Sequence, residues 1–282
     1  MFRRLLVVVF CGALVSSCFD PPEYPDPPEI SFKSISFRRG GQPLPEDPSQ
    51  IAADSIILVL NFKDGDGDVG IGSDETMPPF NDRWYATKSR VGYDPEQAKD
   101  CSPFAADHCY FVSSVAKDFD KYVKISDKKL PDYDTLKPFA KPFNCVNWDV
   151  VYWDNDNNID TPPVPLDTLY FTLNPHYNNI FVEFEMKLDN PPDPSYPYEA
   201  FNEQQYFTYP NCGVRTFHGR IPILSEDPGD ATPLEGEIRY AIPSISFETI
   251  FGSRTLRLKV YIEDRSLNKS NTVFTRDFTL QE

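Results

Sequence analysis

The feature that most constrains the fold is a period-two alternation of apolar and polar residues. The segments IFVEFEMKL (180–188) and RTLRLKVYIED (254–264) place apolar residues at every second position, with charged residues between them. EIRYAI (237–242) follows the same pattern. Successive side chains of a β-strand point to opposite faces, so this spacing predicts strands that are buried on one face only.

Three further segments predict strands with special features. In ISFKSISF (30–37) the apolar phase slips between Phe32 and Ile35, which predicts a β-bulge. SIILVLNF (55–62) is apolar on both faces, as expected for a central strand covered on both sides. The segment NTVFTRDFTL closes the chain, and its in-phase apolar residues are Phe274, Phe278 and Leu280.

Helices are expected to be few and short. No segment keeps a helical period over three turns, and the chain carries 28 prolines spread through its connections. Short helices are possible around DPEQAKD (94–100) and ISFETIF (245–251). These observations predict an all-β protein, with an antiparallel β-sandwich as the best arrangement.

The middle of the chain is less regular than its ends. From Asp64 to about Pro175 only short strand candidates occur, separated by polar stretches. We interpret residues 64–175 as an irregular insertion into one β-sandwich domain that spans residues 30–282. Two tandem sandwiches, with a boundary near residues 160–175, are the alternative.

The first 29 residues predict export and lipid anchoring. Residues 1–17 contain two arginines, an apolar run of about eleven residues and small residues before Cys18, which is the layout of a signal peptide. The run is too short to span a bilayer as a helix. The ending Val-Ser-Ser-Cys resembles a lipobox, in which Cys18 becomes the lipid-modified first residue; ordinary cleavage with Cys18 as a structural cysteine is the alternative. Residues 18–29 are rich in proline and acids and predict an extended tether.

The charge of the chain restricts its partners. It has 27 basic and 43 acidic residues and a net charge of −16, which becomes −18 when Arg3 and Arg4 leave with the signal peptide. Such a charge repels nucleic acid and anionic lipid surfaces. We therefore expect cations or neutral molecules as ligands, and no nucleic acid.

The strongest chemical feature is the acidic, glycine-rich stretch KDGDGDVGIGSDE (63–75). Asp64, Asp66 and Asp68 alternate, and Glu75 is at position twelve counted from Asp64. Calcium takes six to eight oxygen ligands, so these carboxylates could wrap one Ca²⁺. The spacing is close to that of an EF-hand loop, but the glycine is at position seven rather than six and no helices flank it. The alternative is a solvated turn, since Asp and Gly also dominate turns without metal.

A second acidic stretch offers the same chemistry. WDNDNNID (153–160) alternates side chains that can supply carboxylate or amide oxygens. Its ligand candidates are Asp154, Asp156, Asn158 and Asp160, with Asp167 near enough to contribute. A solvated turn is again the alternative.

Four cysteines besides Cys18 remain in the mature chain, and an even number outside the cytoplasm favours disulfides. We expect Cys101–Cys109, which closes a short polar loop, and Cys145–Cys212. Sequence alone leaves all three pairings open. A zinc site and free thiols are the alternatives, although no pair has the close spacing of a zinc site.

The lack of catalytic motifs in the sequence favours a binding protein over an enzyme. The sequence contains no GxSxG, HExxH, phosphate-loop or dinucleotide motif. His108, His176 and His218 share no ligand spacing and are expected to be surface or strand residues. A glycan hydrolase needs only two carboxyl groups brought together by folding, and it is the enzymatic alternative.

A proline-rich loop carries the aromatic residues that could bind a ligand. Aromatic rings on loops stack on sugars or anchor protein partners, unless they pack on the sandwich to cover it. The residues of PPDPSYPYEAFNEQQYFTYP concerned are Tyr196, Tyr198, Phe201, Tyr206, Phe207 and Tyr209.

The end of the chain, LRLKVYIEDRSLNKSNTVFTRDFTL, resembles the final hairpin of immunoglobulin or fibronectin type III-like domains. There an Asp and an Asn-Lys-Ser turn join the last two strands. Together with the lipobox, FKDGDGDVG and LEGEIRY, the chain is similar to Bacteroidota-type outer-membrane lipoproteins, and its acidic tether resembles their surface-export tags.

This resemblance implies an immunoglobulin-like β-sandwich anchored in the outer membrane, and the tether favours a position facing the cell exterior. It brings no catalytic residues. We expect a binding or accessory module whose partner is a glycan or another envelope protein.

Overall fold

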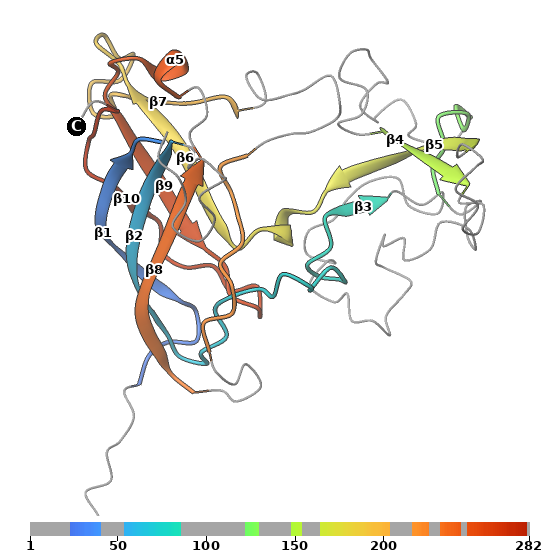
Figure 1. The fold of residues 1–282 in the computed structure, drawn as a ribbon, viewed down its shortest axis with the longest axis horizontal. Coiled ribbons are helices and arrows are strands. Elements are labelled where there is room, and N and C mark those ends of the chain that lie inside the picture. Colours follow the sequence, from blue (N-terminus) through green and yellow to red (C-terminus); the bar gives the residue numbers. More distant parts are fainter. Residues whose placement is uncertain are drawn as a thin grey trace, which may run out of the picture.

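The computed structural model describes residues 23–40, 54–85, 122–129, 148–153, 164–203, 216–225, 232–243 and 247–280. Within them the protein is built mainly from antiparallel β-sheets, which confirms the all-β prediction. Two sheets enclose the main core and form what we call the two-sheet unit, and a third sheet lies to one side of it (Figure 1). Across the described parts of the chain, no helix is both long enough and apolar enough to cross a membrane.

The first sheet has the order β1-β2-β8. Its strands are β1 (Glu29–Arg38), β2 (Ser55–Asp64) and β8 (Leu234–Pro243). The register of β1 against β2 shifts between Phe32 and Ser34, which confirms the predicted bulge. β2 is central, as predicted, and Ile56, Ile57 and Leu58 are buried on both of its faces. Towards its end β2 exposes Asn61 and Lys63, so only its first half is covered on both sides.

The second sheet has the order β10-β9-β6-β7. Its strands are β6 (Ile180–Lys187), β7 (Tyr198–Ala200), β9 (Leu256–Ile262) and β10 (Val273–Phe274). In β9 every second residue from Leu256 to Ile262 is fully buried, which confirms the predicted alternation.

The final strand departs from the predicted phase. Phe278 and Leu280 are buried, but Phe274 is 43% exposed and its ring lies 4.5 Å from the Arg257 guanidinium. Thr275 is buried instead, because its hydroxyl accepts a hydrogen bond from Leu258 N–H at 2.9 Å. The expectation for Phe274 was wrong because this polar contact breaks the alternation after β10.

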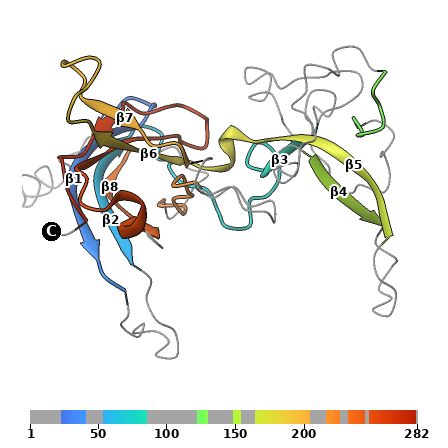
Figure 2. The same ribbon diagram turned by 90° about the horizontal axis from the view of Figure 1, so that it is seen from above.

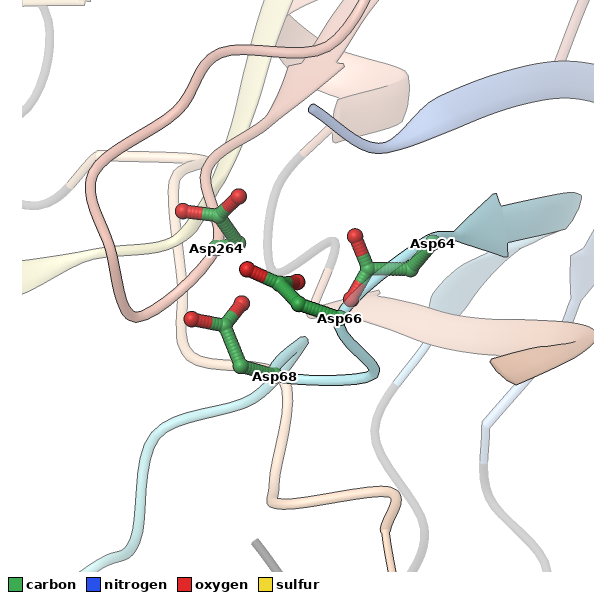
Figure 3. A group of neighbouring side chains, drawn as sticks. All are labelled: Asp64, Asp66, Asp68 and Asp264. Carbon is green, nitrogen blue, oxygen red and sulfur yellow. The ribbon is translucent and has the colours of Figure 1, made fainter. Parts of the chain in front are cut away.

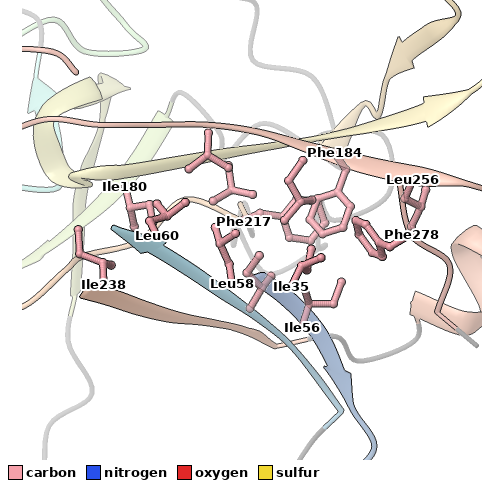
Figure 4. Close-up of a cluster of buried hydrophobic side chains, with 14 of the residues drawn as sticks. Ile35, Ile56, Leu58, Leu60, Ile180, Phe184, Phe217, Ile238, Leu256 and Phe278 are labelled. Carbon is pink, nitrogen blue, oxygen red and sulfur yellow. The ribbon is translucent and has the colours of Figure 1, made fainter. Parts of the chain in front are cut away.

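Side chains from both sheets form one hydrophobic cluster (Figure 4). Phe184 of β6 lies near its centre, with the rings of Phe217, Phe247 and Phe251 at 4.3, 5.4 and 5.3 Å. Two of these rings come from the short helix α5 (Phe247–Phe251), which confirms the helix predicted around residues 245–251. The helix considered around residues 94–100 lies outside the described residues.

Part of the predicted insertion forms the third sheet, of order β3-β5-β4. Its strands are β3 (Arg83–Tyr85), β4 (Trp148–Trp153) and β5 (Val164–Leu173). The sheet stands apart from the two-sheet unit in both views (Figures 1 and 2). It has buried side chains of its own, since Leu169 is fully buried and Trp148 packs edge-on against Tyr170 at 5.1 Å.

The two chain segments that join this sheet to the two-sheet unit are held together at one point. After β5, the 3₁₀ helix η4 (Pro175–Tyr177) leads into β6. Just before it, the side-chain NH₂ of Asn174 donates to the carbonyls of Pro79 and Asn81, both at 2.6 Å. Its backbone N–H donates to Asp82 O at 3.0 Å. The outgoing and returning segments are therefore adjacent.

Candidate metal centre

The acidic stretch begins at the last residue of β2. Asp64 pairs in register with Leu234 of β8 and is fully buried. The chain then turns away from the sheet, and Asp66 and Asp68 follow at alternating positions in the loop. The core strand β2 thus fixes the first carboxylate, and the loop brings the next two back towards it.

Glycines allow this loop to pass close to other backbone segments. A Cβ at Gly65 would lie 2.5 Å from Tyr24 O and 2.7 Å from Pro25 O. Gly67 has φ +67°, and a Cβ there would collide with the Thr232 carbonyl. A left-handed φ and a close approach are both positions where glycine is required.

A fourth carboxylate comes from the other end of the sequence. Asp264 follows β9 and begins the turn of the β9–β10 hairpin, where its Oδ1 accepts a hydrogen bond from Asn268 N–H at 2.7 Å. The same turn holds Asp68, because Ser266 donates to Asp68 Oδ2 from its N–H at 3.0 Å and from its hydroxyl at 2.7 Å. The hairpin turn and the β2 loop are therefore joined through the Asp68 carboxylate.

The four carboxylates converge on one point (Figure 3). One oxygen from each of Asp64, Asp66, Asp68 and Asp264 lies within 4.8 Å of the others. Asp64 and Asp264 are 0% and 1% exposed. Both oxygens of Asp64, Oδ1 of Asp66 and Oδ2 of Asp264 are buried and accept no hydrogen bond from any residue that the structure describes.

This arrangement costs free energy as long as the carboxylates are charged. Burial raises the pKa of Asp64 to about 7, and the charges of Asp66, Asp68 and Asp264 raise it further, although the nearby Asp68 N–H lowers it. Burial likewise raises the pKa of Asp264 to about 7, with smaller contributions from Asp68 and Asp66 against the Asn268 hydrogen bonds. Burial and the charges of Asp68 and Asp26 raise the pKa of Asp66. A bound cation would remove both the desolvation cost and the repulsion.

The donor set fits a hard divalent cation. Two oxygens bound to one Ca²⁺ at about 2.4 Å can be at most about 4.8 Å apart, which matches the spacing of the cluster. All four donors are carboxylates, whereas zinc and copper sites favour imidazole or thiolate ligands. Four carboxylates can supply four to eight oxygens, which meets the requirement of calcium without further side chains.

Glu75, the predicted ligand at position twelve, lies outside this group. Its Oε2 and Oε1 accept hydrogen bonds from Arg265 Nη1 and Nη2, each at 2.6 Å, and Oε2 also accepts from Gly72 N–H at 2.6 Å. The hydrogen bonds from Arg265 lower the pKa of Glu75. Asp264 takes the place that the loop spacing assigned to Glu75.

The other predicted sites lie mostly outside the described residues. This applies to Asp154, Asp156, Asn158 and Asp160, to Cys18, Cys101, Cys109, Cys145 and Cys212, and to Tyr206, Phe207 and Tyr209. The structure describes the backbone of Asp167 in β5 but not its side chain.

The described aromatic residues of the proline-rich loop divide into two kinds. Phe201 is 8% exposed and packs in the core against Phe251 at 4.8 Å, so it cannot contact a ligand. Tyr196 is 46% exposed, and its hydroxyl donates to Glu185. Tyr198 is half-buried beneath the Arg257 guanidinium at 3.5 Å. Phe201 therefore covers the sheet and does not bind a ligand.

The described histidines are not members of the carboxylate cluster. His176 Nδ1 is 3.0 Å from Glu263 Oε2, and His218 Nδ1 accepts a hydrogen bond from Val182 N–H at 3.2 Å. His108 lies outside the described residues. Comparison with known proteins adds no assignment, since no family model, curated protein or solved structure matches the chain.

Proposed function

We propose that the cluster of Asp64, Asp66, Asp68 and Asp264 is a calcium site that ties the β2 loop to the β9–β10 hairpin. One observation carries this proposal. Asp64 is fully buried at the end of a core strand, both of its oxygens accept no hydrogen bond from the described residues, and three other carboxylates face it. A cation accounts for such a group, whereas a solvated turn does not, because water does not reach Asp64.

An immunoglobulin-like sandwich is the fold that best accommodates this site. The orders β1-β2-β8 and β7-β6-β9-β10 correspond to strands A-B-E and C′-C-F-G of that fold. In this correspondence the β2 loop is the B–C loop and the β9–β10 turn is the F–G loop. These two loops meet at one end of such sandwiches, which explains how Asp64 and Asp264 come together.

The wider role follows from the N-terminus and the charge. We propose a protein anchored through lipidated Cys18 in the outer membrane and facing the exterior, which serves as a binding or accessory module. The calcium site stabilises its loops, and its partner is a glycan or another envelope protein. The net charge of −16 and the exposed ring of Tyr196 support a neutral ligand rather than an anionic one.

The cluster is unsuited to the enzymatic alternative. A glycan hydrolase places two carboxyl groups about 5–10 Å apart on either side of a sugar. Here four carboxylates lie within 4.8 Å of one another, and the two with a pKa of about 7 are at most 1% exposed. A sugar ring has no access to them, so we propose a structural site.

Thermal unfolding of the full chain in detergent tests the calcium site. A ligand that binds only the folded state stabilises it by about 2.7 kcal/mol at one hundred times its Kd. We expect calcium to raise the Tm, chelator to reverse this, and Asp66→Ala to abolish the response. Asp74→Ala removes an exposed carboxylate of the same loop and should keep it. An unchanged wild-type Tm would contradict the proposal.

Binding to a panel of neutral polysaccharides tests the partner. Tyr196→Ala should weaken any retained glycan, because an exposed ring can stack on a sugar. Tyr177→Ala removes a ring of similar exposure that lies elsewhere, under Arg220, and is the matched control. Equal binding of both variants would exclude Tyr196 from the glycan site and favour a protein partner.

A further inference from the structure

The end of the tether is fastened to the β2 loop. The Tyr24 hydroxyl donates to Glu235 Oε2 at 2.7 Å, and Lys63 Nζ lies 4.9 Å from the centre of the Tyr24 ring. The carbonyl of Pro25 accepts a hydrogen bond from Gly65 N–H at 2.9 Å. Tyr24 and Pro25 thus contact the strand end and the loop that present the carboxylates.

This contact brings another carboxylate, that of Asp26, near the loop, although it is not one of the four whose oxygens lie within 4.8 Å of one another. Asp26 follows Pro25, and Asp66 follows Gly65, so each carboxylate is one residue beyond the Gly65–Pro25 hydrogen bond. Asp26 is exposed, and its negative charge acts on Asp66. Without a cation the two carboxylates repel each other, and with one they can share it.

We propose that Asp26 is a fifth carboxylate of the calcium site, so that calcium binding fastens the tether segment 24–26 to the β2 loop. This inference rests on the proposed calcium site and deepens it. The buried, unpaired oxygens of Asp64 and Asp264 indicate the ion, and the Gly65–Pro25 hydrogen bond places the tether beside it.

Attachment of residues 24–26 to the β2 loop would control the distance between the domain and the membrane. Between lipidated Cys18 and the contact at Tyr24 lie residues 19–23, which span at most roughly 18 Å when fully extended. If the segment detaches, the free tether runs to residue 27, since Pro28 is buried, and its reach increases to roughly 32 Å. Calcium would therefore hold the domain close to the lipid surface, and its removal would let the domain move outwards.

Calorimetric titration of the full chain with calcium, in detergent, tests the fifth carboxylate. Asp26→Asn should raise the Kd by roughly three- to tenfold, because it removes a ligand. Glu23→Gln makes the same change of charge three residues away, where the described part of the chain shows no hydrogen bond or ion pair to the loop, and it should change the Kd less than twofold. Both positions are exposed, so both variants should fold.

Hydrogen exchange on the same proteins tests the fastening. The Gly65 amide reports the tether contact, and the Ile71 amide, which donates to Ile221 O at 2.9 Å, reports the loop alone. With calcium present, Asp26→Asn should speed exchange at Gly65 severalfold and leave Ile71 unchanged.

The outcomes separate the two proposals. If the wild-type chain binds no calcium, both fail. If it binds calcium, but Asp26→Asn matches Glu23→Gln in Kd and in Gly65 exchange, only the fifth carboxylate is overturned and the calcium site stands. If Asp26→Asn alone weakens binding and loosens Gly65, the inference holds.

Discussion

Arg265 binds both carboxylate oxygens of Glu75 and immediately follows Asp264 in the chain. The ion pair closes the loop that begins at Asp64 and positions it against the hairpin turn. The guanidinium is engaged with Glu75, and its charge also acts on Asp68 of the carboxylate cluster. Glu75 thus braces the carboxylate cluster from outside, and in the proposed calcium site it is not a ligand.

Replacing Glu75 should reduce stability more than cation affinity. The two side chains are 28% and 26% exposed and their contact is bidentate, so Glu75→Gln should cost about 1 kcal/mol, at the upper end for such pairs. Asp74→Asn, at the neighbouring exposed position, should cost almost nothing. Urea unfolding measures both. A loss of calcium affinity as large as that of Asp66→Ala would instead make Glu75 a ligand.

Stability without calcium should fall as the pH rises. The pKa of Asp64 and Asp264 is about 7 in the folded state and about 3.9 when unfolded, so the folded state holds more protons between these values. By linkage, the free energy of unfolding then decreases from about pH 4 to pH 7. With chelator present, we expect a higher Tm at pH 5.5 than at pH 8.

The calcium response should show the opposite trend. Protons compete with the cation for the carboxylates, so the Tm increase on adding calcium should be larger at pH 8 than at pH 5.5. Asp64→Asn should flatten the chelated pH profile. It will retain the slope from Asp264 and from Glu203, whose pKa values burial also raises to about 7. A chelated wild-type profile that rises from pH 5.5 to pH 8 would contradict the raised pKa values.

Gly67→Ala tests whether the glycine of the loop is required. Its left-handed φ alone costs an alanine about 1–2 kcal/mol, and the Cβ would also collide with the Thr232 carbonyl. Gly252→Ala is the matched control, since Gly252 has φ +57° with no atom within 4 Å of the added Cβ. Thermal unfolding should show a clearly larger loss for Gly67→Ala. Equal losses would mean that the loop moves to accept the side chain.

Phe184→Ala tests the core shared by the two sheets. Phe184 is 1% exposed and touches three other rings, so its truncation should cost about 3–5 kcal/mol. Phe274→Ala removes the same side chain from the surface and should cost about 0.5–1 kcal/mol, mainly its contact with Arg257. Denaturant unfolding measures both. Similar costs would show that the two sheets do not share a core.

Sequence patterns predicted those structural features that are determined by residues close together in the chain. The alternation in β9 and the bulge after Phe32 arise from the pleat of a single strand, and both were found. Asp64, Asp66 and Asp68 were recognised because their alternation is local. The displaced phase at Phe274 was missed because it depends on a hydrogen bond between Thr275 and another strand.

The fourth carboxylate of the cluster could not be placed by spacing. Asp264 is 200 residues from Asp64 in the sequence, and only the pairing of strands brings them together. The spacing of a calcium loop therefore favoured Glu75. It could not predict that Arg265, far along the chain, binds this carboxylate. The sequence did carry one signal, the Asp of the last hairpin, which is Asp264. It was interpreted as part of a turn and not as a source of negative charge.

The hydrogen bonds of Asn174 to the segment 79–82 determine how the third sheet affects the rest of the molecule. Because they fix the departing and returning chain side by side, the described residues between 83 and 173 belong to one excursion that is closed at its base. The entropic cost of such an excursion grows only with the logarithm of its length. Lengthening, shortening or exchanging it should therefore leave the registers of β2 and β6 unchanged, and new recognition surfaces could arise there without altering the core.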